Sequence, residues 1–276
     1  MINAPTGHES PRRSSRESYY ERTDEHHYKP TPHAQGAWSL DEQHFGPVSG
    51  LLAHVLDRHL TERPGTGLAM ARISYDILGR IAFEECEVTV ETIRPGRTIE
   101  LLEAVLRIGD RPVVRARAWL LASLDTTAVT DTPFEPLPHP DTLAPWTMGD
   151  TWGGGYIASL DARRVPSQRK GRNQAWISST VDLVAGEPRS ELASYLTLVD
   201  TANGIAVQQD PTAWMFPNVD LTIHLHRTPR GPWTGLDTSV TFGPTGQGVT
   251  SSVLHDLHGP VGHAEQILTV RPMPVG

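Results

Sequence analysis

The sequence predicts an α+β protein made of two similar units, each with one long helix and an antiparallel sheet. Three observations support this prediction. A proline-rich segment divides the chain near its middle, a helical pattern followed by strand patterns occurs on each side of it, and a short motif recurs on both sides. With 276 residues, the chain is long enough for two small domains.

The dividing segment runs from residue 125 to residue 149 and is rich in Thr, Asp and Pro. Proline restricts φ and lacks a backbone donor, so neither a helix nor a central strand fits there. We therefore predict a linker at 125–149, an N-terminal unit at 19–124 and a C-terminal unit at 150–276. Residues 1–18 are polar and have no apolar stretch, which predicts a disordered leader rather than a secretion signal.

Each unit has one helical pattern near its beginning. Apolar residues recur at helical spacing over residues 47–60. Residues 190–203 show a second such pattern, between Ser190, a good N-cap, and Gly204, a good helix stop. We expect one helix in each of these two places.

Strand patterns follow each helix. Apolar and polar residues alternate over residues 86–90 and again over 221–225, as in strands with one buried face. By the same criteria, the remaining expected strands are at 99–107, 113–121, 239–242, 249–255 and 261–270.

A short motif links the two units. Residues 111–120 recur 148 positions later as residues 259–268, with Pro, Val, Ala and Leu in register. A long helix wrapped by an antiparallel sheet, present twice, is a tandem or double hotdog arrangement. The structural alternative is a ferredoxin-like repeat, which needs two helices per unit.

Composition excludes several classes of protein. The net charge of −8 argues against a protein that coats nucleic acid. No apolar run approaches about 18 residues, so no membrane-spanning helix is expected. The single cysteine, Cys86, excludes an intrachain disulfide and a cysteine-rich metal site. We predict a cytoplasmic protein that needs neither a metal nor another cofactor.

Three segments of the second unit carry a resemblance to a known family. They are residues 198–200 (LVD), 218–227 (NVDLTIHLHR) and 264–271 (AEQILTVR). They resemble motifs of the acyl-CoA thioesterase II family, whose members are double-hotdog enzymes of fatty acid metabolism. The resemblance covers residues 196–271 well and the first unit in outline.

The resemblance implies a catalytic set of Asp, Thr and Gln that binds and orients a water molecule. By motif position, the Asp falls on Asp200 and the Gln on Gln266, while the Thr position is occupied by Asn218. An amide can orient a water but has no hydroxyl. Thr222 lies nearby in sequence, at a different place along the strand. The implied activity is hydrolysis of an acyl-CoA or a related acyl thioester.

The residues themselves allow both functional and structural interpretations. Asp200 lies at the edge of the apolar helix face near the helix C-terminus, where burial and the helix dipole raise a carboxyl pKa. It could also face solvent or cap the next turn. Gln266 stands where the first unit has Ala118, so it serves either a site or a structural hydrogen bond. Asn218 could likewise satisfy backbone groups where the strand begins.

Two further features relate to substrate binding. Gly46, just before the first helix, is a candidate backbone donor to the reacting oxygen. A cationic cluster could bind the phosphates of coenzyme A or an acidic carrier protein, or could be a solvated loop. It consists of Arg163, Arg164, Arg169, Lys170 and Arg172.

Two alternatives to the thioesterase remain open. One is an acyl-thioester or lipid-binding protein that kept the fold without turnover. The other is a hotdog hydratase or dehydratase, which normally needs an Asp–His pair, whereas the second helix has Asp200 and no His. The expected partners are an acyl-CoA or acyl-thioester substrate and further copies of the chain, in a homodimer or higher homo-oligomer.

Overall fold

The computed structural model describes residues 17–63, 67–166 and 169–274. The predicted leader therefore lies outside the described residues, apart from Glu17 and Ser18. Ser18 is buried and begins the first strand, β1 (Ser18–Arg22).

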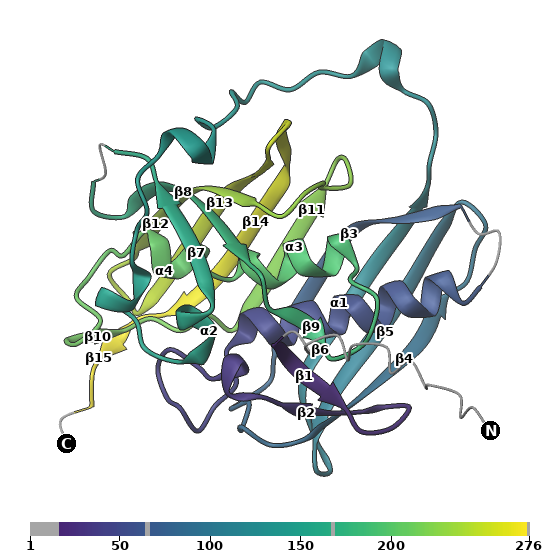
Figure 1. The fold of residues 1–276 in the computed structure, drawn as a ribbon, viewed down its shortest axis with the longest axis horizontal. Helices are drawn as coiled ribbons and strands as arrows, with labels where there is room; N and C mark the ends of the chain where they lie inside the picture. Colours follow the sequence, from purple (N-terminus) through teal and green to yellow (C-terminus); the bar gives the residue numbers. More distant parts are fainter. Residues whose placement is uncertain (1–16, 64–66, 167–168, 275–276) are drawn as a thin grey trace, which may run out of the picture.

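A 13-stranded sheet in the described residues forms the framework, in the order β7-β8-β12-β13-β14-β11-β3-β6-β5-β4-β2-β1-β9 (Figure 1). The first unit supplies β3 (Leu68–Ile77), β4 (Cys86–Arg94), β5 (Ile99–Ile108) and β6 (Arg111–Ala122). The second unit supplies β11 (Asp220–Leu225), β12 (Thr234–Phe242), β13 (Gln247–Asp256) and β14 (Gly259–Thr269). The strands predicted from alternation and spacing fall within or overlap these elements.

The two sets of four strands are arranged alike. From the shared β3–β11 pair, β3-β6-β5-β4 and β11-β14-β13-β12 run outward in the same order. The repeated motif lies on β6 and β14, which occupy equivalent places. Each unit contributes one long helix, so the ferredoxin-like alternative is excluded and the tandem α+β arrangement is confirmed.

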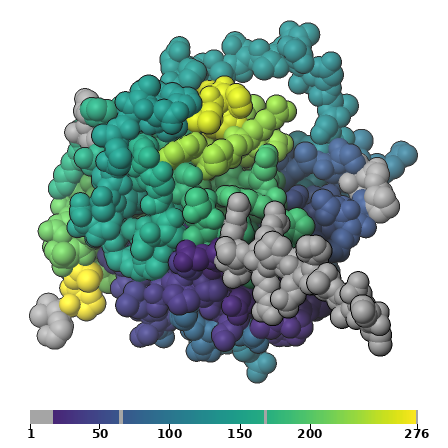
Figure 2. All heavy atoms as spheres, in the orientation of Figure 1, coloured from purple at the N-terminus to yellow at the C-terminus, as the bar shows by residue number. Residues whose placement is uncertain are grey.

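Additional strands extend both ends of the sheet. β7 (Leu160–Arg164) and β8 (Arg172–Ser179) lie beyond β12. β2 (His27–Pro30), β1 and β9 (Asp182–Val184) lie beyond β4. β1 is parallel to β9, so the beginning of the chain pairs with the second unit. In the space-filling view, the purple N-terminal elements accordingly lie against teal residues of the second unit (Figure 2). A separate pair is formed by β10 (Trp214–Met215) and β15 (Arg271–Pro272).

The first helix, α1 (Phe45–Thr61), begins two residues before the predicted start. The second predicted helix is shorter than expected: α3 (Glu191–Val199) ends before Asp200, and a separate turn, α4 (Ala202–Ile205), follows. Ser190 is the N-cap as predicted. A continuous helix over 190–203 was wrong because the Thr201 hydroxyl donates to the Leu198 carbonyl (2.5 Å) and competes with the helical backbone pattern.

Short helical turns occupy the connections. They are η1 (Pro32–Ala34), η2 (Thr127–Val129), η3 (Pro140–Thr142), η4 (Met148–Asp150) and α2 (Gly155–Ala158). The segment 125–149 carries three of them and passes along the outside of the sheet in Figure 1. Among the described residues, no helix combines the length and apolar character needed to span a membrane.

The helices α1 and α3 pack against each other on one face of the sheet and run antiparallel. They lie very close together at Gly50, where an added Cβ would lie 1.9 Å from the Thr197 hydroxyl oxygen. A Cβ at Gly46 would lie 2.7 Å from the Thr197 carbonyl oxygen and from the Tyr156 ring. Glycine at these two positions lets the helices approach closely.

We predict that Gly50→Ala lowers the free energy of unfolding by about 1–3 kcal/mol, the usual cost of overpacking. Helix propensity alone predicts the opposite, a gain of about 1 kcal/mol. The measurement is urea denaturation at a single pH. Gly153→Ala is the control, because nothing lies within 4 Å of an added Cβ there. A Gly50→Ala protein more stable than the wild type would contradict the close helix contact.

Candidate active site

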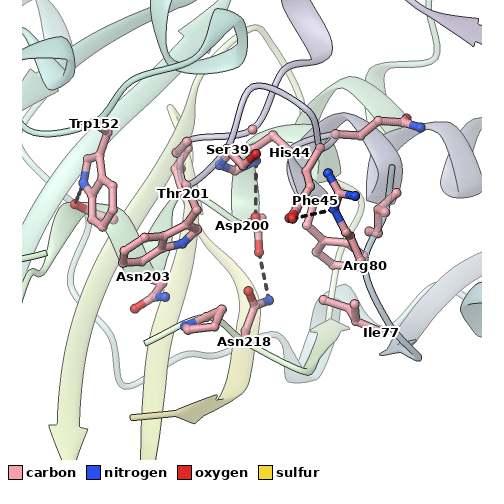
Figure 3. A pocket seen from close by; sticks show the side chains of 18 of the residues that line it. Ser39, His44, Phe45, Ile77, Arg80, Trp152, Asp200, Thr201, Asn203 and Asn218 are labelled. Carbon is pink, nitrogen blue, oxygen red and sulfur yellow. Dashed lines mark hydrogen bonds and ion pairs between the residues drawn. The ribbon is translucent and has the colours of Figure 1, made fainter. Parts of the chain in front are cut away.

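A cavity of about 390 Å³ opens where α1 begins and α3 ends. The loop 36–45, the ends of β3 and β11 and the turn α4 complete its walls. Its volume is in the range of small-molecule sites. Figure 3 shows both polar and aromatic side chains in the wall, among them His44, Phe45, Arg80, Trp152, Asp200 and Asn218.

Asp200 is the acidic group at the centre of this wall. It is the C-cap residue of α3 and only 7% exposed. Burial raises the pKa of its carboxyl to about 7, although hydrogen bonds from Asn218 and Gln266 oppose the increase. A carboxyl with a pKa near neutrality can exchange protons at physiological pH.

The three residues singled out in the sequence meet at Asp200: Asp200 and Asn218 line the cavity (Figure 3), and Gln266 contacts Asp200 from outside the lining. The side-chain amides of Gln266 and Asn218 donate to Asp200 Oδ1 at 2.8 and 3.1 Å. Gln266 lies on β14 and points inward with Ala264 and Leu268. Asn218 lies two residues before the start of β11, where it forms a bridge with Leu268. Two strands thus hold the amides against the end of one helix.

The amides bind the carboxyl group, which leaves their oxygens available. Gln266 Oε1 is buried without a hydrogen-bond partner in the described residues. Such a buried acceptor is costly unless a water or ligand satisfies it. Asp200 Oδ2 accepts a hydrogen bond from neither amide and is likewise free to accept one from a water.

His44 is a site residue that the sequence analysis missed. It is the N-cap of α1, and its Nδ1 lies 3.5 Å from Asp200 Oδ2. Burial lowers the pKa of its imidazole to about 3. The available signal was a polar residue three positions before the predicted start of the helix, which becomes the N-cap because α1 begins at Phe45. That signal marks a cap and does not reveal that the second unit supplies a carboxyl beside it.

Two sequence hypotheses change on this geometry. The Gly46 N–H, a candidate donor to the reacting oxygen, donates instead to His44 Nδ1 at 3.0 Å. The second helix has no histidine, but His44, the N-cap of α1, lies beside Asp200. An Asp–His pair is therefore present, and the absence of a histidine from the second helix does not exclude a hydratase.

The predicted cationic cluster lies away from the cavity. None of its five members lines the wall, where Arg80 and Arg271 supply the cationic groups. Arg163 pairs with Asp161, and Arg172 pairs with Asp237. In the described part of the chain, no group of His, Cys, Asp or Glu residues is arranged to hold a metal ion.

Comparison with protein families identifies the chain. The model of the acyl-CoA thioesterase N-terminal domain matches residues 34–121, and that of the C-terminal domain matches residues 140–270. The chain belongs to the acyl-CoA thioesterase family. The predicted assignment to an enzyme family of thioester hydrolases is thereby confirmed.

Solved structures support the fold of this thioesterase. A hot dog fold protein from Alicyclobacillus acidocaldarius is similar with a TM-score of 0.71 at 12% identity, over 90% of this chain and 93% of that chain. A protein assigned as a thioesterase II from Thermobifida fusca gives 0.68 at 18% identity, over 91% and 95%. The acyl-CoA thioesterase II TesB2 from Mycobacterium marinum gives 0.64 at 16%, over 93% and 96%. A search of curated proteins finds no match.

We predict that Asp200→Asn stabilises the thioesterase at pH 8. The folded-state pKa of Asp200 is raised from 3.8 to about 7, so ionisation costs the folded state progressively from about pH 4 to pH 7. Asparagine does not ionise and keeps an oxygen for both amides. The gain should approach about 4 kcal/mol at pH 8 and disappear near pH 4. Urea denaturation at both pH values measures it; an equal effect at the two would contradict the raised pKa.

Proposed function

We propose that this thioesterase hydrolyses an acyl-CoA or related acyl thioester, with Asp200 as the general base. The observation that carries the proposal is the Asp200 carboxyl, with a pKa near 7, held by two amides in the wall of a partly apolar cavity. An acyl chain fits an aromatic and aliphatic wall, and a base poised near pH 7 suits activation of water.

In the proposed reaction, a water donates one hydrogen bond to Asp200 Oδ2. The other hydrogen of the water forms a hydrogen bond with an amide oxygen of Gln266 or Asn218. This contact orients the lone pair of the water oxygen toward the thioester carbon. Asp200 takes a proton as the C–O bond forms, and the carbonyl oxygen becomes an oxyanion. Collapse of this tetrahedral intermediate breaks the C–S bond, and the thiolate leaves with the proton that Asp200 returns. The products are a carboxylic acid and a thiol.

Asn218 occupies the position where the family motif has threonine. Its Nδ2 donates to both Asp200 Oδ1 and the Asp220 carbonyl, each at 3.1 Å. The side chain therefore supports the carboxyl while its oxygen stays free for the water. Thr222 does not replace the missing threonine, because it lies along β11 and does not line the cavity.

A hydratase is the second candidate, favoured by the 3.5 Å approach of His44 to Asp200. In the dehydration direction the histidine abstracts a proton next to the carbonyl, so its outward nitrogen must be unprotonated. In this chain Nδ1 accepts a backbone N–H, which leaves the proton on Nε2. The tautomer therefore favours hydrolysis over proton abstraction by His44.

We propose a cytoplasmic homodimer or higher homo-oligomer. Val249 and Ile267, 40% and 38% exposed, are register partners on β13 and β14 and give the outer face of the sheet an apolar strip. Association of copies through such a face would cover it.

We predict that the purified protein releases thiol from acyl-CoAs, and that Asp200→Asn lowers kcat by about 10²-fold or more, the typical contribution of a positioned general base. The assay uses short, long and branched acyl-CoAs. Asp57→Asn is the matched control: Asp57 lies on α1 and lines a second cavity at the other end of the helix pair.

The results separate the alternatives. Full activity of Asp200→Asn would remove Asp200 as the base. Binding of acyl-CoA without thiol release by the wild type would favour the binding protein. Hydration of an enoyl-CoA without thiol release would favour the hydratase.

We predict that kcat/KM rises with pH through about 7 and then levels, because the base must be ionised and its pKa is raised to about 7. Two ionisable neighbours stay neutral in this range, since burial lowers the pKa of His44 and raises that of Tyr156. The charged groups in the wall are Glu42, Arg80 and Arg271. A pH–rate profile from pH 5 to 9 is the test, and a flat profile between pH 6 and 8 would contradict this base.

A further inference from the structure

His44 is held in one tautomer. The Gly46 backbone N–H donates to His44 Nδ1 at 3.0 Å, and a backbone N–H can only donate. Nδ1 therefore carries a lone pair. Burial lowers the pKa of the ring, so the imidazole is neutral and its single proton is on Nε2. Nε2 is a hydrogen-bond donor.

This donor has no partner within the described part of the chain. No hydrogen bond joins Nε2 to any described residue. Nε2 is also not one of the fully enclosed polar atoms that lack a partner, so the atom is accessible. Because His44 lines the cavity, the N–H has access to whatever occupies it (Figure 3).

The ring is also fixed in position. It lies against the Tyr156 ring, with centroids 4.1 Å apart and an interplanar angle of 31°. Tyr156 is itself anchored, because its hydroxyl donates to the Thr197 carbonyl at 2.8 Å. A donor held in this way needs no rearrangement when charge develops nearby, which is the requirement for stabilising an oxyanion.

We infer that His44 is a further catalytic residue, whose Nε2–H donates a hydrogen bond to the carbonyl oxygen of the bound thioester. The inference rests on the proposed hydrolysis. Nδ1 is 3.5 Å from Asp200 Oδ2, Nε2 is separated from Nδ1 by one ring carbon, and His44 and Asp200 both line the cavity, so base and donor border the same space from different sides. A carbonyl carbon there can receive water from Asp200 while its oxygen meets His44.

The role of His44 involves no proton transfer. The proton stays on Nε2, and the hydrogen bond strengthens as the carbonyl oxygen becomes an oxyanion. When the intermediate collapses, the negative charge leaves with the thiol sulfur and the hydrogen bond weakens again. His44 therefore replaces Gly46 as the donor to the reacting oxygen.

Two variants separate this role from helix capping. In His44→Asn, the side-chain oxygen replaces Nδ1 and keeps the cap, but no donor reaches the place of Nε2. In His44→Gln, the longer amide reaches the place of Nε2 and the acceptor at the Nδ1 position is lost. His139→Asn is the matched control, because His139 caps η3 through Nδ1 at 3.3 Å, away from the cavity.

We expect His44→Asn to fold with a melting temperature close to that of the wild type and to lose about 10²–10³-fold in kcat, with KM little changed. His44→Gln should keep more activity than His44→Asn despite a lower melting temperature. His139→Asn should match the wild type. The pH profile of His44→Asn should keep its rise near pH 7, because Asp200 remains the titrating group.

The opposite pattern would overturn the inference. If His44→Asn is fully active and His44→Gln is impaired, His44 is only a helix cap. If His44→Asn loses the rise near pH 7, His44 acts in proton transfer instead. If the wild type is active and either of these results is found, only the role of His44 is contradicted. If the wild type releases no thiol, both the proposed hydrolysis and this role are contradicted.

Discussion

The close contact between α1 and α3 is the constraint on which the site depends. Gly46 and Gly50 bring α1 against Thr197 of α3, within a distance that no larger residue allows. Since the helices run antiparallel, the start of α1 then lies beside the end of α3, and His44 meets Asp200. Neither unit contains the arrangement alone: the first supplies the imidazole, and the second supplies the carboxyl and both amides.

Because the two units are similar and their helices run antiparallel, a second cavity lies at the other end of the helix pair. Asp57 and Ser190 are among the residues that line it. The residues at equivalent sequence positions of the two units have diverged. Ten residues after the N-cap of each helix, the second unit has Asp200 and the first has His54, which pairs with Glu187 at 2.7 Å. Gln266 likewise corresponds to Ala118. The duplicated framework therefore carries one cluster of carboxyl and amides and, at the equivalent sequence position, a hydrogen-bonded His–Glu contact that joins the two units.

Much of this structure could be predicted from the sequence, because half-buried strands and capped helices leave local patterns. The two helices, the main strands and their repetition were found in this way, and motif resemblance brought Asp200, Asn218 and Gln266 together. The elements that were missed depend on distant contacts. β1 is short and mostly buried, with no clear alternation, and it exists because it pairs with β2 and β9. His44 reaches Asp200 across 156 positions of sequence, a proximity that no local pattern encodes.

The parallel pairing of β1 with β9 has a consequence for the order in which the chain can fold. Ser18 aligns with Asp182 and Tyr20 with Val184, so β1 leaves the ribosome about 160 residues before its partner β9 is made. Until then Tyr19 and Tyr20, both buried in the finished sheet, have no complete surface to cover them. The protein thus closes its sheet only late in synthesis, and contacts between such distant segments slow folding through the entropy of closing a long loop. The two similar units are in this way joined through one continuous sheet.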